Sequence, residues 1–154
     1  MIIFSMIGLM FSILLQQTPE AKLEKIRDDF YKLNSSEEIK SYLELGKGSS
    51  NPVVEAYMAS ATMKMGKYTM WPNKKIAYFN EGKDVMESLI KEHPDNVEIR
   101  YLRYLIQAKA PSFLGYDKDK TKDCDFVMKN LKSSKIPKAY QETMLNCIKT
   151  ITKK

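Results

Sequence analysis

Two arginines and a glutamine form the pattern in this sequence that most resembles a chemical site. Arg100, Arg103 and Gln107 are spaced i, i+3 and i+7 within the apolar run VEIRYLRYLIQ, so a helix places them in one narrow polar stripe. Two guanidinium groups one turn apart, beside an amide, can bind a carboxylate or a phosphate. The stripe therefore predicts a ligand groove for an anionic group.

The same stripe has a structural interpretation. Arginines on a helix can also face solvent or pair with acidic residues, here Glu55 or Glu87. The two interpretations differ for the double substitution Arg100→Ala and Arg103→Ala. A ligand groove predicts a protein that folds nearly normally and loses affinity for an anion, whereas internal ion pairs predict a protein that fails to fold.

Cys124 and Cys147 are the two thiols of the chain, and both belong to apolar helix faces. They are equally distant in sequence from the Lys135-Ile136 connection, so an antiparallel arrangement of the last two helices brings them to the same level. This spacing predicts a disulfide, which would contribute about 3 kcal/mol in the chain-entropy model and would form in an oxidising compartment. The alternative is a pair of buried free thiols.

Other arrangements of reactive side chains are sparse. The single histidine, His93, directly precedes Pro94, where the end of a helix explains it. Four aspartates cluster between lysines but lack the glycine and the final glutamate of an EF-hand, so they are interpreted as the start of a helix: Asp117, Asp119, Asp123 and Asp125. No metal-ligand spacing and no nucleophile motif is evident. The sequence therefore predicts no catalytic residue, no metal and no cofactor.

The chain carries a formal net charge of +6, mostly from lysine. A basic chain can favour nucleic acid or anionic lipid, but these lysines alternate with Asp and Glu, which is typical of a solvated surface. No basic run with interleaved aromatic residues is present. Nucleic acid is therefore not expected as a partner.

The first seventeen residues, MIIFSMIGLMFSILLQQ, contain no charged side chain. A helix over the apolar part, Met1 to Leu15, would extend about 22 Å, which is short of the roughly 30 Å hydrocarbon core of a membrane. That length is typical of a secretory signal, so residues 1–17 are predicted to be a signal peptide and the protein to be exported. The alternative is a short anchor that stays attached.

Residues 18–154 show recurring helix starts and ends. Thr18-Pro19, the capping box Ser35 to Glu38, Asn51-Pro52 and Asp95 each predict the beginning of a helix. Apolar residues recur every three to four positions after each start. The predicted fold is one all-α domain of about seven helices, arranged as stacked antiparallel helix pairs.

Two helices carry more specific predictions. Gly82 lies inside the helix expected over about 73–92 and costs about 1 kcal/mol relative to Ala, so a close neighbouring helix is expected there. Apolar residues of the next helix, about 97–108, cover more than half of its circumference, which predicts a central helix. Trp71, in the connecting loop before residue 73, is expected to seal a helix junction, with a binding-site aromatic as the alternative.

The spacing Gly82-x3-Met86-x2-Leu89-x4-Pro94 resembles the second helix of a tetratricopeptide repeat (TPR). PDNVEIRYLRYLIQ resembles the first helix of the following repeat, although Arg100 stands where that motif usually has Trp and Tyr104 where it has Gly. NEGKDVMESLI and HPDNVEIRYLRYLIQAKAPSFLGY are also similar to small exported bacterial TPR-like proteins. The resemblance implies stacked helix pairs and protein binding, and it supplies no catalytic residue.

These features predict a non-enzymatic, exported interaction or scaffold module, periplasmic or secreted, that binds a protein or peptide. Its concave face would include the ligand groove at Arg100, Arg103 and Gln107. The alternative is an envelope-attached protein that retains residues 1–17 as an anchor and places its lysines against anionic lipid. An enzyme is the least favoured class.

Overall fold

The computed structural model describes residues 18–153 of the 154-residue chain. Within this range the backbone forms seven α-helices, three short 3-10 helices and no β-strand, which confirms the all-α prediction. The α-helices are α1 (Pro19–Phe30), α2 (Ser36–Gly46), α3 (Pro52–Met65), α4 (Pro72–Glu92), α5 (Val97–Lys109), α6 (Lys120–Asn130) and α7 (Lys138–Thr152). The 3-10 helices are η1 (Gly66–Tyr68), η2 (Ser112–Leu114) and η3 (Leu131–Ser133).

Side-chain caps fix where several helices begin. The hydroxyl of Thr18 accepts a hydrogen bond from the backbone N–H of Ala21, and the Ser35 hydroxyl accepts one from Glu38. These bonds satisfy backbone donors that have no partner within the helix. The cap of α5 differs from the prediction, because the Asn96 side chain, and not Asp95, accepts from the first turn.

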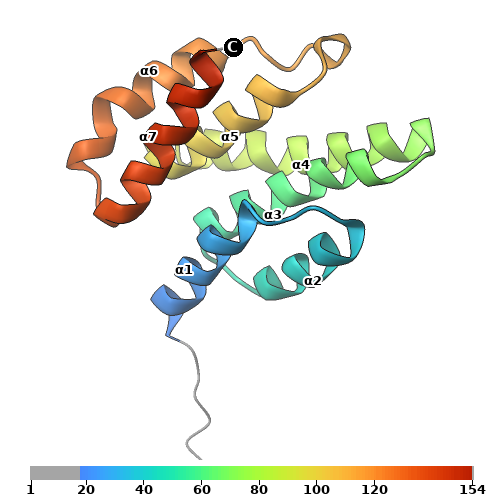
Figure 1. The fold of residues 1–154 in the computed structure, drawn as a ribbon, viewed down its shortest axis with the longest axis horizontal. Coiled ribbons are helices and arrows are strands. Elements are labelled where there is room, and N and C mark those ends of the chain that lie inside the picture. The colour runs from blue at the N-terminus through green and yellow to red at the C-terminus, as the bar shows by residue number, and fades with distance from the viewer. Residues whose placement is uncertain (1–17, 154) are drawn as a thin grey trace, which may run out of the picture.

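Two helices form the centre of the fold (Figure 1). The helix α3 contacts α1, α2, α4 and α5, and α5 contacts α3, α4, α6 and α7. In Figure 1, α1 and α2 lie on one side of α3, while α6 and α7 lie beyond α5. Most residues of α5 are buried, which confirms the prediction of a central helix. Its neighbours must therefore satisfy every polar side chain that it carries inward.

The close approach expected at Gly82 is present between α3 and α4. A Cβ atom added at this position would lie 2.4 Å from the backbone oxygen of Ala59 and 2.6 Å from Cγ of Met63. The helices pack at a distance that no larger side chain permits. The missing side chain therefore accounts for a glycine inside a helix.

The predicted signal peptide or anchor, residues 1–17, lies outside the described residues. Among residues 18–153, no helix combines the length and the apolar character needed to cross a membrane.

Candidate functional site

The arginine stripe lies in the interior and not along an open groove. Arg100, Arg103 and Gln107 are all buried on α5. Both guanidinium groups bind Asp123 of α6, a fully buried carboxylate. The predicted ligand groove is therefore corrected to an internal ion-pair cluster, because the anion that occupies the stripe is a side chain of the same protein.

Arg103 makes the most contacts in this cluster. Its Nε donates to Oδ2 of Asp123 at 2.6 Å, and its Nη2 donates to Oδ1 at 2.9 Å. Its Nη1 donates to Glu87 at 2.9 Å, which is one of the two acidic partners expected from the sequence. Burial opposes the charge of Arg103, but the hydrogen bond and charge of Asp123 outweigh it, so the pKa of Arg103 is raised. Gln107 contacts neither carboxylate, and its buried Oε1 has no hydrogen-bond partner among the described residues.

The disulfide expected between Cys124 and Cys147 is not formed, and both residues are free thiols. Each thiol packs against a different tyrosine of α5. Cys124 lies beside the Tyr104 hydroxyl, and Cys147 lies beside the Tyr101 hydroxyl. Burial raises the pKa of the Cys124 thiol. The two cysteines thus face the central helix and not each other.

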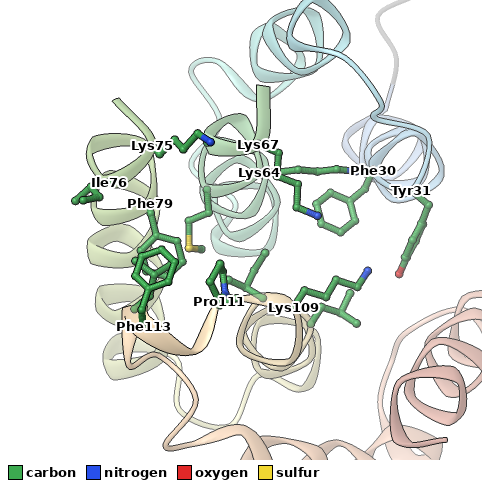
Figure 2. Close-up of a pocket in the computed structure, with 16 residues that line it drawn as sticks. Phe30, Tyr31, Lys64, Lys67, Lys75, Ile76, Phe79, Lys109, Pro111 and Phe113 are labelled. Carbon is green, nitrogen blue, oxygen red and sulfur yellow. The ribbon is translucent and has the colours of Figure 1, made fainter. Parts of the chain in front are cut away.

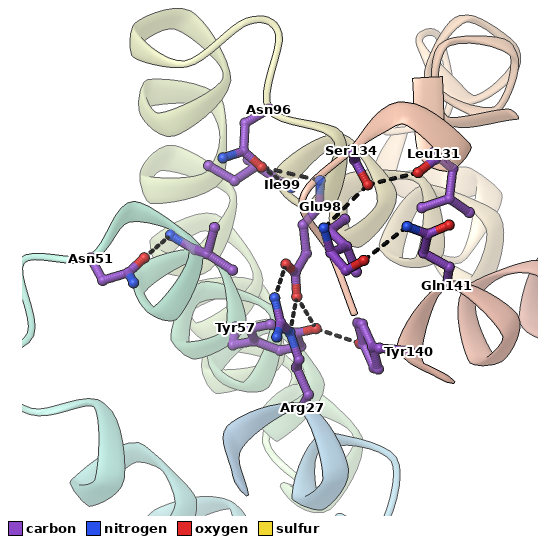
Figure 3. Close-up of polar contacts among 12 residues, drawn as sticks. Arg27, Asn51, Tyr57, Asn96, Glu98, Ile99, Leu131, Ser134, Tyr140 and Gln141 are labelled. Carbon is purple, nitrogen blue, oxygen red and sulfur yellow. Dashed lines mark hydrogen bonds and ion pairs between the residues drawn. The ribbon is translucent and has the colours of Figure 1, made fainter. Parts of the chain in front are cut away.

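A second buried ion pair joins helices that are far apart in sequence (Figure 3). Arg27 of α1 binds Glu98 of α5 through two hydrogen bonds, of 2.8 and 2.6 Å. The hydroxyl of Tyr57, on α3, donates to the same carboxylate at 2.8 Å. Burial opposes the charge of Arg27, yet the hydrogen bond from Arg27 to Glu98 leaves the Arg27 pKa raised. No local sequence pattern pairs these two residues, because they lie 71 positions apart.

Tyrosine hydroxyls extend this cluster to the last helix. Tyr140 of α7 is hydrogen-bonded to Tyr57 and also to Tyr31, the latter at 2.9 Å. Tyr31 in turn contacts the Tyr101 hydroxyl at 2.8 Å. The guanidinium of Arg27 lies 5.1 Å from the centre of the Tyr140 ring. Each of these hydroxyls has a hydrogen-bond partner within the cluster, which therefore connects α1, α3, α5 and α7.

An open pocket of about 440 Å³ lies between the end of α1, α3, α4, the end of α5 and η2 (Figure 2). This volume lies within the range of roughly 300–1,000 Å³ that is typical of small-molecule sites. Most of the lining is apolar. The lining residues are Phe30, Tyr31, Met63, Lys64, Gly66, Lys67, Lys75, Ile76, Phe79, Leu105, Ile106, Lys109, Ala110, Pro111, Phe113 and Leu114.

The pocket has two unlike sides. Figure 2 shows Ile76, Phe79 and Phe113 together on one side, whereas Lys64 and Lys109 extend on the side of Phe30 and Tyr31. The Tyr31 hydroxyl is already bonded to two other tyrosines. The amino groups are therefore the main polar atoms that a ligand would meet.

No acidic side chain balances the lysines that line this pocket in the described part of the chain. Four lysines line it, and no acidic residue does among those that the structure describes. None of Lys64, Lys67, Lys75 and Lys109 forms an ion pair with a residue in 18–153. Burial, followed by the charges of Lys67 and Lys109, lowers the pKa of Lys64, while the charge of Glu38 has a smaller effect in the opposite direction. The site holds cations that repel one another.

Exposed apolar side chains border the pocket. The segment between its lining residues Lys67 and Lys75 contains Met70 and Trp71, which are 92% and 65% exposed. Phe113, in η2, is 79% exposed. The expectation that Trp71 seals a helix junction is therefore wrong, because its side chain is mostly exposed. Trp71 is not among the residues that line the pocket.

Little in the amino-acid sequence singles out these lysines. Lys64 and Lys109 lie in the last turns of α3 and α5, and Lys67 directly follows α3 in η1. Cations are common at helix C-termini, because they complement the helix dipole. Each residue therefore has a local explanation, and only the fold brings the ends of α3 and α5 together.

No group of three or more His, Cys, Asp or Glu residues within the described part of the chain is arranged to hold a metal ion. Comparison with known proteins identified no matching family, curated protein or solved structure.

Proposed function

We propose that this protein is a non-enzymatic binding module whose ligand site is the lysine-bordered pocket between α3, α4, α5 and η2. The observation that supports this function is an open apolar cavity of about 440 Å³ with four lysines that have no acidic partner in residues 18–153. Burying apolar surface would drive binding, and the lysines would orient the ligand. The module binds and does not turn over a substrate.

The arrangement of helices supports a TPR-like organisation for this module. Each of the pairs α1/α2, α3/α4 and α5/α6 packs together, and the first helices α1, α3, α5 and α7 contact one another in succession. Stacked helix pairs have this pattern of contacts. In this proposal the pocket forms where the C-terminal ends of α1, α3 and α5, with the loops that follow them, meet α4.

Export remains part of the proposal, with a periplasmic or secreted location. It is supported by the uncharged apolar segment at residues 1–17. N-terminal sequencing of the mature protein would test it. A chain that begins after residue 17 supports export with cleavage, and a membrane-bound chain that retains Met1 supports an anchor.

A pocket-filling variant tests the proposed binding function. Nile red, a neutral apolar dye whose fluorescence rises in apolar surroundings, would be titrated into the full chain and into Ala110→Phe. Ala110 lines the pocket and is half-buried, so a phenyl group there should occupy the cavity and reduce dye affinity at least tenfold. The matched control is Ala139→Phe, at an exposed position of α7. Equal dye binding by both variants, or no binding by the native chain, would contradict the proposed site.

A second candidate function is attachment to an anionic membrane surface. It is favoured by the exposed side chains of Met70, Trp71 and Phe113 close to the lysines of the pocket. Aromatic and basic side chains on one surface are typical of interfacial binding. Co-sedimentation with vesicles that contain phosphatidylglycerol, together with a blue shift of Trp71 fluorescence, would support this function.

A further inference from the structure

We infer that the pocket binds a single-chain aliphatic anion, such as a long-chain fatty acid, with its alkyl chain along Ile76, Phe79 and Phe113 and its anionic group among Lys64, Lys67 and Lys109. This inference rests on the proposed binding function and adds the chemistry of the ligand. The charge of the pocket, its hydrogen-bonding groups and its shape support this ligand class.

Charge complementarity sets the sign of the ligand. Lys64 is half-buried, and the cations nearest to it are Lys67, which follows α3, and Lys109 of α5. Burial is the main cause of the lowered pKa of Lys64, and the charges of Lys67 and Lys109 add to it. No acidic side chain among the lining residues offsets these three cations. A bound carboxylate would remove the repulsion. The anionic end of the ligand is therefore assigned to this side of the pocket.

Hydrogen bonding favours an alkyl chain over a peptide. The side chains opposite the lysines are apolar, so they offer no hydrogen-bond partner to a peptide backbone. A peptide that entered in an extended conformation would bury its own amides without partners, at a cost of roughly 1–3 kcal/mol each. An alkyl chain has no polar group to satisfy. A helical peptide, about 10 Å wide, would insert only a few side chains into a cavity of about 440 Å³.

The apolar N-terminal segment of the chain is a poorer occupant. Residues 1–17 contain no acidic side chain. In the pocket this segment would cover apolar surface but would leave the cations at Lys64, Lys67 and Lys109 uncompensated. An external ligand with an anionic end matches both sides of the pocket.

Three probes with the same twelve-carbon chain test this assignment: dodecanoate, dodecanol and dodecyltrimethylammonium. Each would compete with Nile red for binding to the full chain, at concentrations below the micelle concentration of the two ionic probes and below the solubility limit of dodecanol. Dodecanoate is expected to bind at least tenfold more tightly than dodecanol, and the cation is expected to bind most weakly. Dodecyl phosphate would serve as a fourth probe, and tighter binding than dodecanoate supports the inference and assigns a phosphate head group.

Charge variants locate the anionic end. The double variant Lys64→Gln with Lys109→Gln should lose about tenfold or more in affinity for dodecanoate while its affinity for dodecanol stays unchanged. The control, Lys129→Gln with Lys149→Gln, removes the same charge from exposed positions on α6 and α7 and should keep the preference for dodecanoate.

Each contrary outcome has a distinct meaning. Equal affinity for dodecanoate and dodecanol would overturn the inferred ligand class and leave the proposed pocket intact. No displacement of Nile red by any probe would overturn both. Binding to phosphatidylglycerol vesicles without binding to monomeric dodecanoate would overturn the inference in favour of membrane attachment.

Discussion

Asp123 shows how one carboxylate can determine the role of two arginines. It is fully buried and accepts hydrogen bonds from both Arg100 and Arg103. Substitution Asp123→Asn would leave the buried guanidinium of Arg100 without its acidic partner, and Arg103 would keep only the more exposed Glu87 and Asp119. Breaking a buried ion pair by removing one partner typically costs about 3–5 kcal/mol. We expect a loss of this size in the free energy of unfolding, measured by urea denaturation and circular dichroism.

A neighbouring aspartate provides the control for this prediction. Asp119 approaches the same guanidinium of Arg103 at 3.7 Å, but its side chain is 25% exposed. Asp119→Asn should therefore cost less than about 1 kcal/mol. Similar losses from the two substitutions would argue against Asp123 as the centre of the cluster. The double substitution Arg100→Ala and Arg103→Ala is now expected to prevent stable folding, because it leaves Asp123 buried and unpaired.

Lys64 should make ligand binding dependent on pH. Burial and the facing charges of Lys67 and Lys109 lower its pKa, and Glu38 opposes them only weakly. An anion binds better when Lys64 is protonated, so affinity for dodecanoate should be greatest at neutral pH and fall as the pH rises through the lowered pKa of Lys64. Titrations of the full chain from about pH 7 to about pH 10 would measure this change.

The comparison for this prediction is the single variant Lys64→Gln. It should bind dodecanoate more weakly at neutral pH and should show a flatter pH dependence over the same interval. A variant with the same pH profile as the native chain would show that another group is responsible. Lys129→Gln, which alters an exposed lysine of α6, should leave the profile unchanged.

At the level of the helices, the contact of α3 with α4 depends on the absence of a side chain at Gly82. The substitution Gly82→Ala improves helix propensity by about 1 kcal/mol. It also places a Cβ atom 2.4 Å from the Ala59 carbonyl oxygen, which belongs to the backbone and cannot rotate away. Overpacking of this kind typically costs 1–3 kcal/mol, and separation of the helices would add to that cost. We expect a net loss of unfolding free energy in thermal denaturation.

An exposed position on the same helix isolates the effect of propensity. Asn80 lies on the solvent side of α4. Asn80→Ala should leave the stability unchanged or raise it slightly, by less than about 1 kcal/mol. If Gly82→Ala were also stabilising, the close helix contact would be refuted.

Local features of the helices could be predicted from the sequence, whereas their distant partners could not. The caps at Thr18 and Ser35 act within four residues, so the sequence contains both members of each interaction. Gly82 predicts a closely packed neighbouring helix, but it does not indicate which helix that is. By contrast, Arg27 and Glu98 are 71 positions apart. Each has an ordinary local explanation on its own helix, so no pattern pairs them.

The sequence also predicts a ligand groove at the wrong place, for the same reason. The spacing of Arg100 and Arg103 correctly predicts one polar stripe on α5. It does not predict that Asp123 binds both arginines, because an aspartate among lysines is typical of the start of a helix. The pocket depends on loops and helix ends that converge only in the folded chain. Lys64 and Lys109 therefore looked like solvated helix termini. Periodicity identifies which face of a helix is polar, and the neighbouring helices decide whether that face is open.

For the whole molecule, a cluster of tyrosine hydroxyls connects the first and last helices, and it should limit stability at high pH. Burial raises the pKa of Tyr31 to about 12 and raises the pKa values of Tyr57, Tyr101 and Tyr140 further. The folded protein therefore holds these protons at a pH where the unfolded chain, with ordinary tyrosine pKa values near 10, releases them. The contribution of these tyrosines to the free energy of unfolding should be fully present below about pH 10 and should fall as the pH rises towards 12.

This linkage predicts cooperative alkaline unfolding, in which the loss of helical circular dichroism coincides with a rise in tyrosinate absorbance. The variant Tyr140→Phe provides a comparison. It removes one phenol, but Tyr57 keeps Glu98 as a partner and Tyr31 keeps Tyr101, so the loss at neutral pH should be about 1–2 kcal/mol. Its alkaline transition should begin at lower pH, because its free energy of unfolding at neutral pH is already smaller than that of the native chain. Ionisation of these buried tyrosines near pH 10 with the helices intact would mean that the hydroxyl cluster is open to solvent and does not join α1 to α7.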